Sequence, residues 1–406
     1  MNVRVLVLAA CTFAVGTGTF VVAGLLGAVA EDLSVSVGAT GHLVTVFAVS
    51  YAVGSPALVA ATGRVGRRRL LVASMLVFAL ANAAAALVPT YPLLLSSRVA
   101  AACGAAVITP VASAVAAEIV SPEHRGRALS VAVGGLSVAW VVGVPLGTLV
   151  GDLYGWRVTF LLVAVLALAA ALAVGALIPS TEIPPPQGIV SRLSVAGRPA
   201  VLVVLGVTLL GLAATFVVLT YVRPVLEAIT GFGPAGIGAM FLLFGLASIA
   251  GTILGGYGAD RLGYRANAVP ILVVLALSLL SFSLLAAVEA GTTPAILGAG
   301  AAVVAWCASG YALLPLQQHR LLAAAPKNAS GVLSLNASAI YAGQGLGAII
   351  GSLVLANISL ATLGLAGALC ALVALAVVAL GATSGFGVHP TAGHRARSEV
   401  ASGDDR

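Results

Sequence analysis

The chain has 406 residues, of which 61% are hydrophobic and only 8% are charged, and it carries a net charge of +7. A soluble domain carries roughly 25% charged residues because its whole surface contacts water, so this composition excludes an ordinary soluble protein and predicts a membrane protein. The basic residues lie in short loops between apolar stretches, which is typical of membrane topology and argues against a nucleic-acid partner.

Twelve apolar segments follow one another along the chain, and each is long enough to cross a hydrocarbon core of ~30 Å as a helix. Strands of a membrane β-barrel would be roughly 10 residues long with alternating polarity, which does not fit these segments. The sequence therefore predicts an all-α membrane protein with twelve transmembrane helices. The predicted spans are residues 5–29, 41–61, 70–88, 92–117, 128–150, 158–178, 200–222, 234–259, 268–288, 293–316, 330–356 and 358–382.

The longest inner connection divides these spans into six and six. It contains three consecutive prolines, Pro184 to Pro186, which prevent a continuous helix. We expect an N-terminal six-helix bundle over residues 1–178, a cytoplasmic linker over 179–199, a C-terminal six-helix bundle over 200–382 and a cytoplasmic tail over 383–406.

The basic residues also predict the orientation of the chain. If the N-terminus is placed in the cytoplasm, sixteen of the 19 basic residues fall in inner segments, whereas only Arg157 and Arg223 fall in outer loops and Arg98 falls inside a span. This asymmetry predicts a multi-pass protein of the cell membrane with both termini in the cytoplasm.

A basic motif occurs in the loop after the second span and again after the eighth, almost half the chain length later. Its arginines are suited to bond carbonyl groups at helix C-termini and carboxylates of neighbouring helices, so we interpret both copies as a cytoplasmic latch that forms in one access state. Simple anchoring to anionic lipid is the alternative. The motif residues are Arg64, Gly66, Arg67 and Arg68 in the first copy and Asp260, Arg261, Gly263 and Arg265 in the second.

Glycine rows with a spacing of four residues occur in the fifth and the eleventh span. Such a row lets another helix approach backbone to backbone, and Pro145 removes an intrahelical hydrogen bond and bends the fifth span. We expect the fifth span to be a flexible, tightly sealed helix between the domains, with static packing as the alternative. Together with the repeated loop, the rows predict two pseudo-symmetric bundles around a central site. The rows are Gly143, Gly147 and Gly151, and Gly343, Gly347 and Gly351.

Arg98 is the only acidic or basic residue, histidines aside, inside the predicted spans. A charge at that depth is costly and usually functional, although snorkelling to the outer headgroups is an alternative. Polar and aromatic side chains of the second half are further candidates for the substrate cavity, or else for hydrogen bonds to neighbouring helices. They are Trp306, Tyr311, Asn336, Tyr341 and Gln344.

No carboxylate lies within the predicted spans, so an acid at the rim must carry the proton if protons drive transport. Asp32, next to Glu31, closes the outer end of the first span. We expect Asp32 to share the outer cavity with Arg98, where the protonation of the carboxyl group would respond to the guanidinium and to drying of the cavity. The alternative is a solvated helix end for Asp32 and a packing role for Arg98.

These features resemble the major facilitator superfamily over essentially the whole chain. The two loops resemble its Gly-x-x-x-Asp-Arg-x-Gly-Arg-Arg motif, with Gly63 in place of the acid in the first copy. Arg98 and Gly104 resemble its arginine motif of span four, and the run from Gly143 to Gly147 resembles the signature of the exporting antiporters. The chain is most similar to twelve-span drug:proton antiporters, near the arabinose-efflux-like and chloramphenicol-resistance exporters, although Thr19 stands where those relatives usually carry Glu.

The resemblance implies a secondary active transporter that exports small amphipathic molecules of the drug or antibiotic type by proton antiport and alternating access. A sugar or nucleoside exporter or facilitator of the same fold is the alternative, and a channel is an alternative of a different class. An ATP-driven pump is disfavoured, because Lys327, the only lysine, lacks the glycines of a phosphate loop. We expect no enzyme activity, metal or cofactor, since a hydrolase within the membrane would need clusters of His, Asp or Glu in the spans and only His42 falls in one. The expected partners are the substrate, a proton and the lipid bilayer, and we expect a monomer.

The predicted topology can be tested with single cysteines at Ser191 and in the tail, in a background without the native cysteines. Because both positions are expected to face the cytoplasm, neither should react with an impermeant thiol reagent in intact cells. Labelling of either position from outside would contradict the orientation.

Overall fold

The computed structural model describes residues 3–121, 124–179, 197–261, 264–325 and 329–380, and these ranges are helical apart from short connections. Twelve helical stretches in them are long and apolar enough to cross a membrane, which confirms the all-α fold with twelve spans. The prolines of the predicted linker and the predicted tail lie outside the described residues.

The helices of the first half bury small and branched apolar side chains along their length, and each half supplies six of the spans. The helices of the first half are α1 (Val3–Phe20), α2 (Val22–Asp32), α3 (Val37–Thr40), α4 (His42–Ala61), α5 (Arg67–Leu87), α6 (Tyr91–Glu118), α7 (Arg125–Val138), α8 (Val144–Tyr154) and α9 (Trp156–Leu177). Those of the second half are α11 (Pro199–Leu219), α12 (Val222–Thr230), α13 (Pro234–Arg261), α14 (Tyr264–Leu285), α15 (Thr293–Ala324), α16 (Ala329–Asn357) and α17 (Leu363–Leu380).

The same helix pairings recur in both halves, which confirms the pseudo-symmetry. In the first half α1 packs against α7, α4 against α6, and α5 against α6 and α9. In the second half α11 packs against α16, α13 against α15, and α14 against α15 and α17. The halves contact one another at an interface that we call the seam, where α4 packs against α16 and the fifth span packs against α13. The second span of each half thus contacts the fifth span of the other half.

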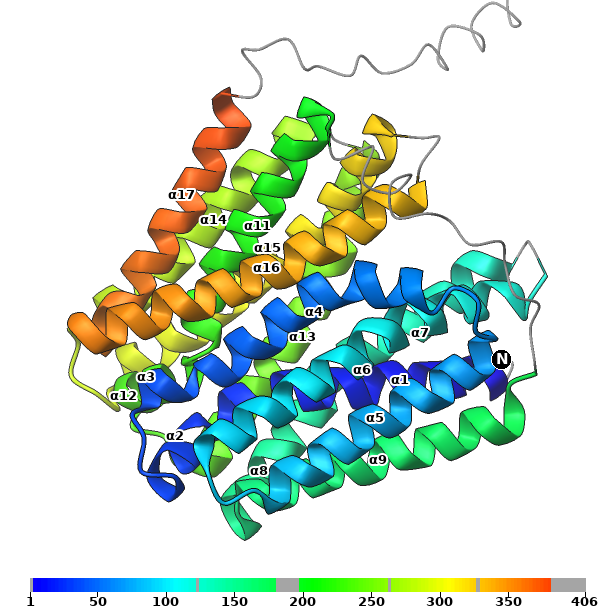
Figure 1. Ribbon diagram of the computed structural model, residues 1–406. Helices are drawn as coiled ribbons and strands as arrows, with labels where there is room; N and C mark the ends of the chain where they lie inside the picture. Colours follow the sequence, from blue (N-terminus) through cyan, green and yellow to red (C-terminus); the bar gives the residue numbers. More distant parts are fainter. Residues whose placement is uncertain (1–2, 122–123, 180–196, 262–263, 326–328, 381–406) are drawn as a thin grey trace, which may run out of the picture.

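The two halves meet at one end of the molecule and diverge toward the other. Figure 1 shows the helices converging where α2, α3, α8 and α12 lie, and spreading apart toward the ends at which α1 begins and α17 stops. We call the first the distal end and the second the terminal end. Buried apolar side chains agree with this shape, because one cluster joins α2 of the first half to the second half, whereas much of α1, α5 and α6 forms a cluster of its own.

The fifth span is interrupted by a π-helical turn over Ala139–Gly143, between α7 and α8. Val144 and Pro145 begin α8, so the proline occupies a position whose N–H needs no partner within that helix. The structure thus shows a local change of helix type directly before Pro145, and the bend at this proline stays a prediction.

The glycine row of the fifth span faces α1 and α2 of the same half. A Cβ on Gly143 would collide with the hydroxyl group of Thr17, and one on Gly147 would lie 2.7 Å from Cγ2 of Val21. In the same way the second row, with Gly343 and Gly347, lies against backbone carbonyls of α11. The rows therefore seal spans within each half and do not form the seam between the halves, where we expected the first row.

Helix α12 was not predicted, because the sequence indicates only a loop after the seventh span. Arg223 and Glu227 face each other four residues apart on this helix, Pro224 lies in its first turn, and Gly231 ends it in the left-handed conformation with φ of 65°. These are local helix signals over a segment too short to cross a membrane, and the hydropathy pattern does not reveal them.

Replacing Gly147 with Leu should impair transport and lower the thermal stability of the purified protein, since the new side chain meets Val21 and Thr159. Overpacking of this kind costs roughly 1–3 kcal/mol. Gly134→Leu in the same span is the matched control, because nothing lies within 4 Å of a Cβ at that position. Equal melting temperatures for the two variants in detergent would contradict the packing argument.

Candidate transport site

A pocket lies between the two halves, near the middle of the molecule. Its volume is about 10 Å³, which is room for a single water molecule and far below the roughly 300–1,000 Å³ of sites that enclose drug-sized ligands, so the halves must part further to admit such a molecule. Its walls carry three polar side chains and otherwise apolar or aromatic groups, and none of the lining residues is ionisable. The lining residues are Thr19, Phe20, Ala23, Val44, Trp140, Phe216, Leu219, Thr220 and Gln344.

Aromatic rings cross the seam beside this pocket. Trp140, in the π-helical turn, stacks on Phe20 with ring centroids 4.2 Å apart and lies 4.4 Å from the ring of Phe244 in the second half. Phe244 in turn makes edge contacts with Trp306 and Tyr311. The π-helical turn therefore places a large aromatic side chain where both halves can contact a ligand.

Some of the predicted pocket residues lie at the seam, and others are buried within the second half. Gln344 is buried and lines the pocket, and Tyr341 stacks on Tyr51 of α4 with ring centroids 3.5 Å apart. Asn336 accepts a hydrogen bond from the hydroxyl group of Thr208 within the second half. Trp306 is fully buried behind Phe244 and contributes no lining surface.

Arg98 is buried, with 1% of its surface exposed, and it does not snorkel to the surface. One of its terminal nitrogens donates to the carbonyl of Gly18, and its guanidinium lies over the rings of Phe47 and Phe160, at 4.7 and 5.7 Å. Its Nε and Nη1 atoms have no hydrogen-bond partner among the described residues. Cation–π contacts and one carbonyl therefore hold this charge, and among the described residues no carboxylate forms an ion pair with it.

Asp32 does not share a cavity with Arg98 as we expected. Its carboxylate forms an ion pair with Arg157 and accepts a hydrogen bond from the indole N–H of Trp156. Both partners lie at the start of α9. Helix α2 continues the first span to the distal end and ends beside α9, which brings Asp32 close to them. The side chain of Asp32 is 43% exposed, which fits the solvated helix end that we gave as the alternative.

The basic motif makes contacts within each half, at the terminal end. Arg67 pairs with Glu118 at the end of α6, and Arg68 donates to the carbonyl of Gly175 near the end of α9. In the second copy Arg265 donates to the carbonyl of Ala379 and Arg261 lies over the ring of Tyr257. Arg64 is exposed, Gly66 directly precedes α5, and Gly263 and the side chain of Asp260 lie outside the described residues.

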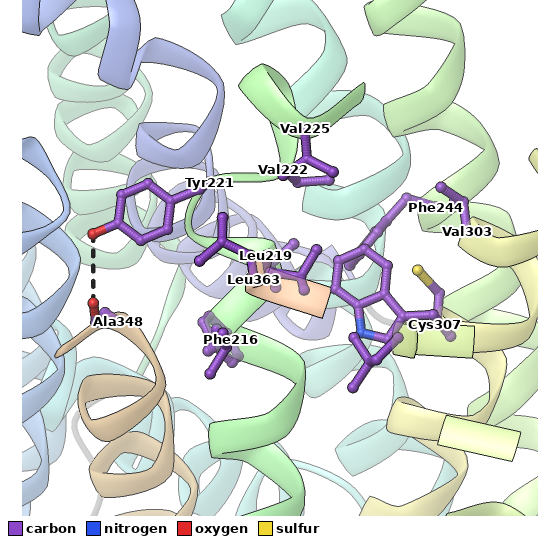
Figure 2. Close-up of a cluster of buried hydrophobic side chains, with 14 of the residues drawn as sticks. Phe216, Leu219, Tyr221, Val222, Val225, Phe244, Val303, Cys307, Ala348 and Leu363 are labelled. Carbon is purple, nitrogen blue, oxygen red and sulfur yellow. Dashed lines mark hydrogen bonds between the residues drawn. The ribbon is translucent and has the colours of Figure 1, made fainter. Parts of the chain in front are cut away.

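Close contacts join the halves at the distal end. The hydroxyl groups of Tyr221 and Ser352 both donate to the carbonyl of Gly38, at 3.2 and 3.0 Å. Figure 2 shows Tyr221 extending from the α11–α12 connection to the carbonyl of Ala348 on α16. Gly41 is tightly covered by the same tyrosine, so a larger residue there would displace it.

An ion pair that the sequence did not reveal crosses the seam at the same end. Nη1 of Arg223 lies 2.7 Å from Oδ1 of Asp152, and Nε of Arg223 lies 2.8 Å from a carboxylate oxygen of Glu227. The same Nη1 donates to the carbonyl of Gly24 in α2. In the sequence these are ordinary charges of outer loops, and only the meeting of the two halves brings them together.

Two echoed halves of six spans, with a pocket between them and close contacts at one end, define a secondary membrane transporter. The sequence profile described as Major Facilitator Superfamily matches residues 8–320, and the chain belongs to this family.

Several curated relatives that match this chain over most of their length are described as transporters. The inner membrane transport protein YdhP of Escherichia coli K12 is 32% identical over 94% of this chain and 96% of its own. An MFS-type transporter of Bacillus subtilis, YbcL, is 30% identical over 92% and 94%, and a chloramphenicol resistance protein of Streptomyces lividans is 38% identical over 68% and 71%. Among solved structures, a bacterial homologue of the lysosomal transporter Spinster aligns with a TM-score of 0.73 at 16% identity, over 93% of this chain and 96% of that one.

Replacing Arg98 with Met should leave the melting temperature in detergent unchanged or raise it, because a buried charge with two unpartnered nitrogens is costly and Met fills a similar volume. Arg223→Met is the comparison, since it leaves Asp152 without its cation and should lower the melting temperature. If Arg98→Met proves the more destabilising of the two, then Arg98 serves mainly to hold helices together.

Proposed function

We propose that this transporter exports small, uncharged amphipathic molecules of the drug or antibiotic type from the cytoplasm, by proton antiport and alternating access. The observation that supports this most directly is the pocket between the halves, whose walls are aromatic and apolar with Thr19, Thr220 and Gln344 as its polar groups. The similarity to a chloramphenicol resistance protein agrees with the same substrate type.

The chemistry of the pocket favours an aromatic substrate without a net charge. Trp140 and Phe20 offer flat apolar surfaces, and stacking on such rings is favourable for aromatic groups. The amide of Gln344 can donate and accept hydrogen bonds, whereas the hydroxyl groups of Thr19 and Thr220 donate to the carbonyls of Val15 and Phe216 and can accept a further bond. A cation would find no carboxylate among the lining residues, and an anion would find no basic group.

The excess of basic residues in the predicted inner segments supports a terminal end in the cytoplasm, so the distal end faces outward in this proposal. The contacts of Tyr221, Ser352 and Arg223 then close the outer side, while the halves spread apart on the inner side. This is the arrangement in which a molecule enters from the cytoplasm. Export requires that these outer contacts break and that the inner ends approach, where the basic motif would act as a latch.

A sugar or nucleoside carrier of the same fold is less well supported. Such substrates present many hydroxyl groups, and leaving these unpaired on burial is costly, whereas this pocket supplies only three polar side chains. A channel is disfavoured because twelve spans in two repeated halves favour alternating access.

Chloramphenicol is the probe for this proposal. Cells that lack their own efflux pumps and express the protein should accumulate several-fold less chloramphenicol, and a protonophore should abolish the difference. Trp140→Ala should raise the apparent KM for efflux about tenfold, which corresponds to ~1.4 kcal/mol of lost contact with the substrate. The matched control is Tyr154→Ala, an exposed aromatic residue at the end of α8.

Export of a sugar or nucleoside in place of chloramphenicol, in the same cells, would contradict the substrate type. Accumulation that follows the concentration gradient and never exceeds it would contradict active export.

A further inference from the structure

Asp152 and Arg223 form an ion pair across the seam at the distal end. Asp152 lies in the last turn of α8 in the first half, and Arg223 lies in the first turn of α12 in the second half. Their side chains are only 12% and 16% exposed, and Nη1 of Arg223 also donates to the carbonyl of Gly24 at 2.8 Å. Arg223 thus binds two elements of the other half at once, and both bonds must break when the distal end opens.

When the ion pair separates, Arg223 keeps a second charged partner and Asp152 does not. Arg223 keeps Glu227, which lies four residues away on the same helix and moves with it. Asp152 has no second cation among the described residues, and its Oδ2 atom is buried without a hydrogen-bond partner. Burial alone would lower the pKa of Arg223, but the hydrogen bonds and charges of Asp152 and Glu227 raise it above its ordinary value, so the arginine stays charged.

We propose that Asp152 is the binding site of the coupling proton, and that its protonation from the outside releases Arg223 and opens the distal end. This rests on the proposed function, in which protons drive export. A neutral carboxylic acid loses the attraction to the guanidinium, so opening costs less when Asp152 is protonated. Acidification of the outside therefore favours the outward-open state, and the deprotonated carboxylate favours closure.

The proton leaves when the halves close again. Arg223 returns to the carboxyl group, the O–H bond of Asp152 breaks, the carboxylate re-forms the ion pair, and the proton passes to water. Thr148 lies four residues earlier on the same face of α8, about 6 Å nearer the pocket. Its hydroxyl oxygen is buried without a partner in the described structure and lies against Gly24, so it offers a polar step for the proton toward the pocket and the inner side.

The other charged groups around this pair are either paired with each other or distant. Of the elements packed against α8 and α12, the distal end of α2 carries Glu31 and Asp32 and the start of α9 carries Arg157. Asp32 and Arg157 form their own ion pair within the first half, and Glu31 is exposed. The ionisable groups at the terminal ends of α1, α13 and α15 include Arg4, Arg261, His319 and Arg320.

The proposal is tested by the distance between the halves as a function of pH. Tyr154 and Ile358 lie at the distal end of opposite halves and are 71% and 68% exposed. In a variant without the native cysteines, spin labels on cysteines introduced at these two positions report the distance between the halves in lipid nanodiscs. The doubly labelled parent protein should shift toward longer distances as the pH is lowered. Asp152→Asn should show the long distances at every pH, and Asp152→Glu should keep the shift.

Arg223→Gln provides a second route if Asp152→Asn does not fold. Without the arginine, closure buries a lone carboxylate, so this variant should no longer open on acidification. Glu289→Gln, an exposed carboxylate in the turn before α15, is the control and should respond as the parent protein does. A parent protein without a pH-dependent distance, an unchanged shift in Asp152→Asn, or a shift lost in Asp32→Asn would each overturn the proposal.

The distance measurement needs no substrate, so it decides the role of Asp152 separately from the substrate type. Chloramphenicol efflux by the same variants gives the second readout. Asp152→Asn should let chloramphenicol equilibrate across vesicle membranes while failing to concentrate it. If Asp152→Asn still concentrates chloramphenicol with the parent's pH dependence, the coupling proton binds elsewhere.

Discussion

Helices in a lipid bilayer can approach one another only as closely as their smallest side chains allow, and this constraint organises the protein. Hydrophobic burial does not favour one helix neighbour over lipid, so packing depends on close backbone contact. The glycine row of the eleventh span supplies that contact to the backbone of the seventh span, whereas the row of the fifth span leaves room for side chains of the first span and α2. Each half is thereby a tightly joined unit, and the seam between the halves is left to aromatic rings and a few polar bonds. Two rigid units with a weaker seam are what alternating access requires.

The charges of this protein follow the same division between rigid halves and a separable seam. Arg98 is enclosed within the first half by Phe47 and Phe160, so its environment travels with it when the halves move. Arg223 and Asp152 stand on opposite sides of the seam, so their environment changes with every movement. A charge enclosed within one half keeps the same neighbours in every state, whereas a charge that reports on conformation must lie where its partner can leave.

The spans and the repeat were predictable because they depend on composition along the chain. Hydropathy predicts twelve helices, and proline and glycine spacing indicates the repeated halves. The partner of Asp32 was not predictable, since it depends on how α2 turns at the distal end. The role of Asp152 at the seam was not predicted, because the hydropathy pattern ends the fifth span two residues before it, whereas α8 continues to Tyr154. Trp140 had no sequence signal as a pocket residue, because its position depends on the π-helical turn that carries it. Local pattern therefore predicts the elements, while contacts across the seam depend on the assembled halves.

The π-helical turn also explains how one row of small residues can face one neighbour over more than four turns of helix. Residues spaced by four drift by about 40° per step around an α-helix, so a row from Gly135 to Gly151 would rotate away by about 160°. A π-helical turn holds more than four residues, so each of its residues advances by a smaller angle and the drift is partly reversed. Gly135, Ala139, Gly143 and Gly151 thus all contact the first span or its continuation, α2. Deleting one residue from Ala139–Gly143 would restore a regular helix and shift the phase of everything beyond it, turning Gly151 and Asp152 away from their present neighbours. The length of this short segment is therefore as strictly determined as the identity of its residues.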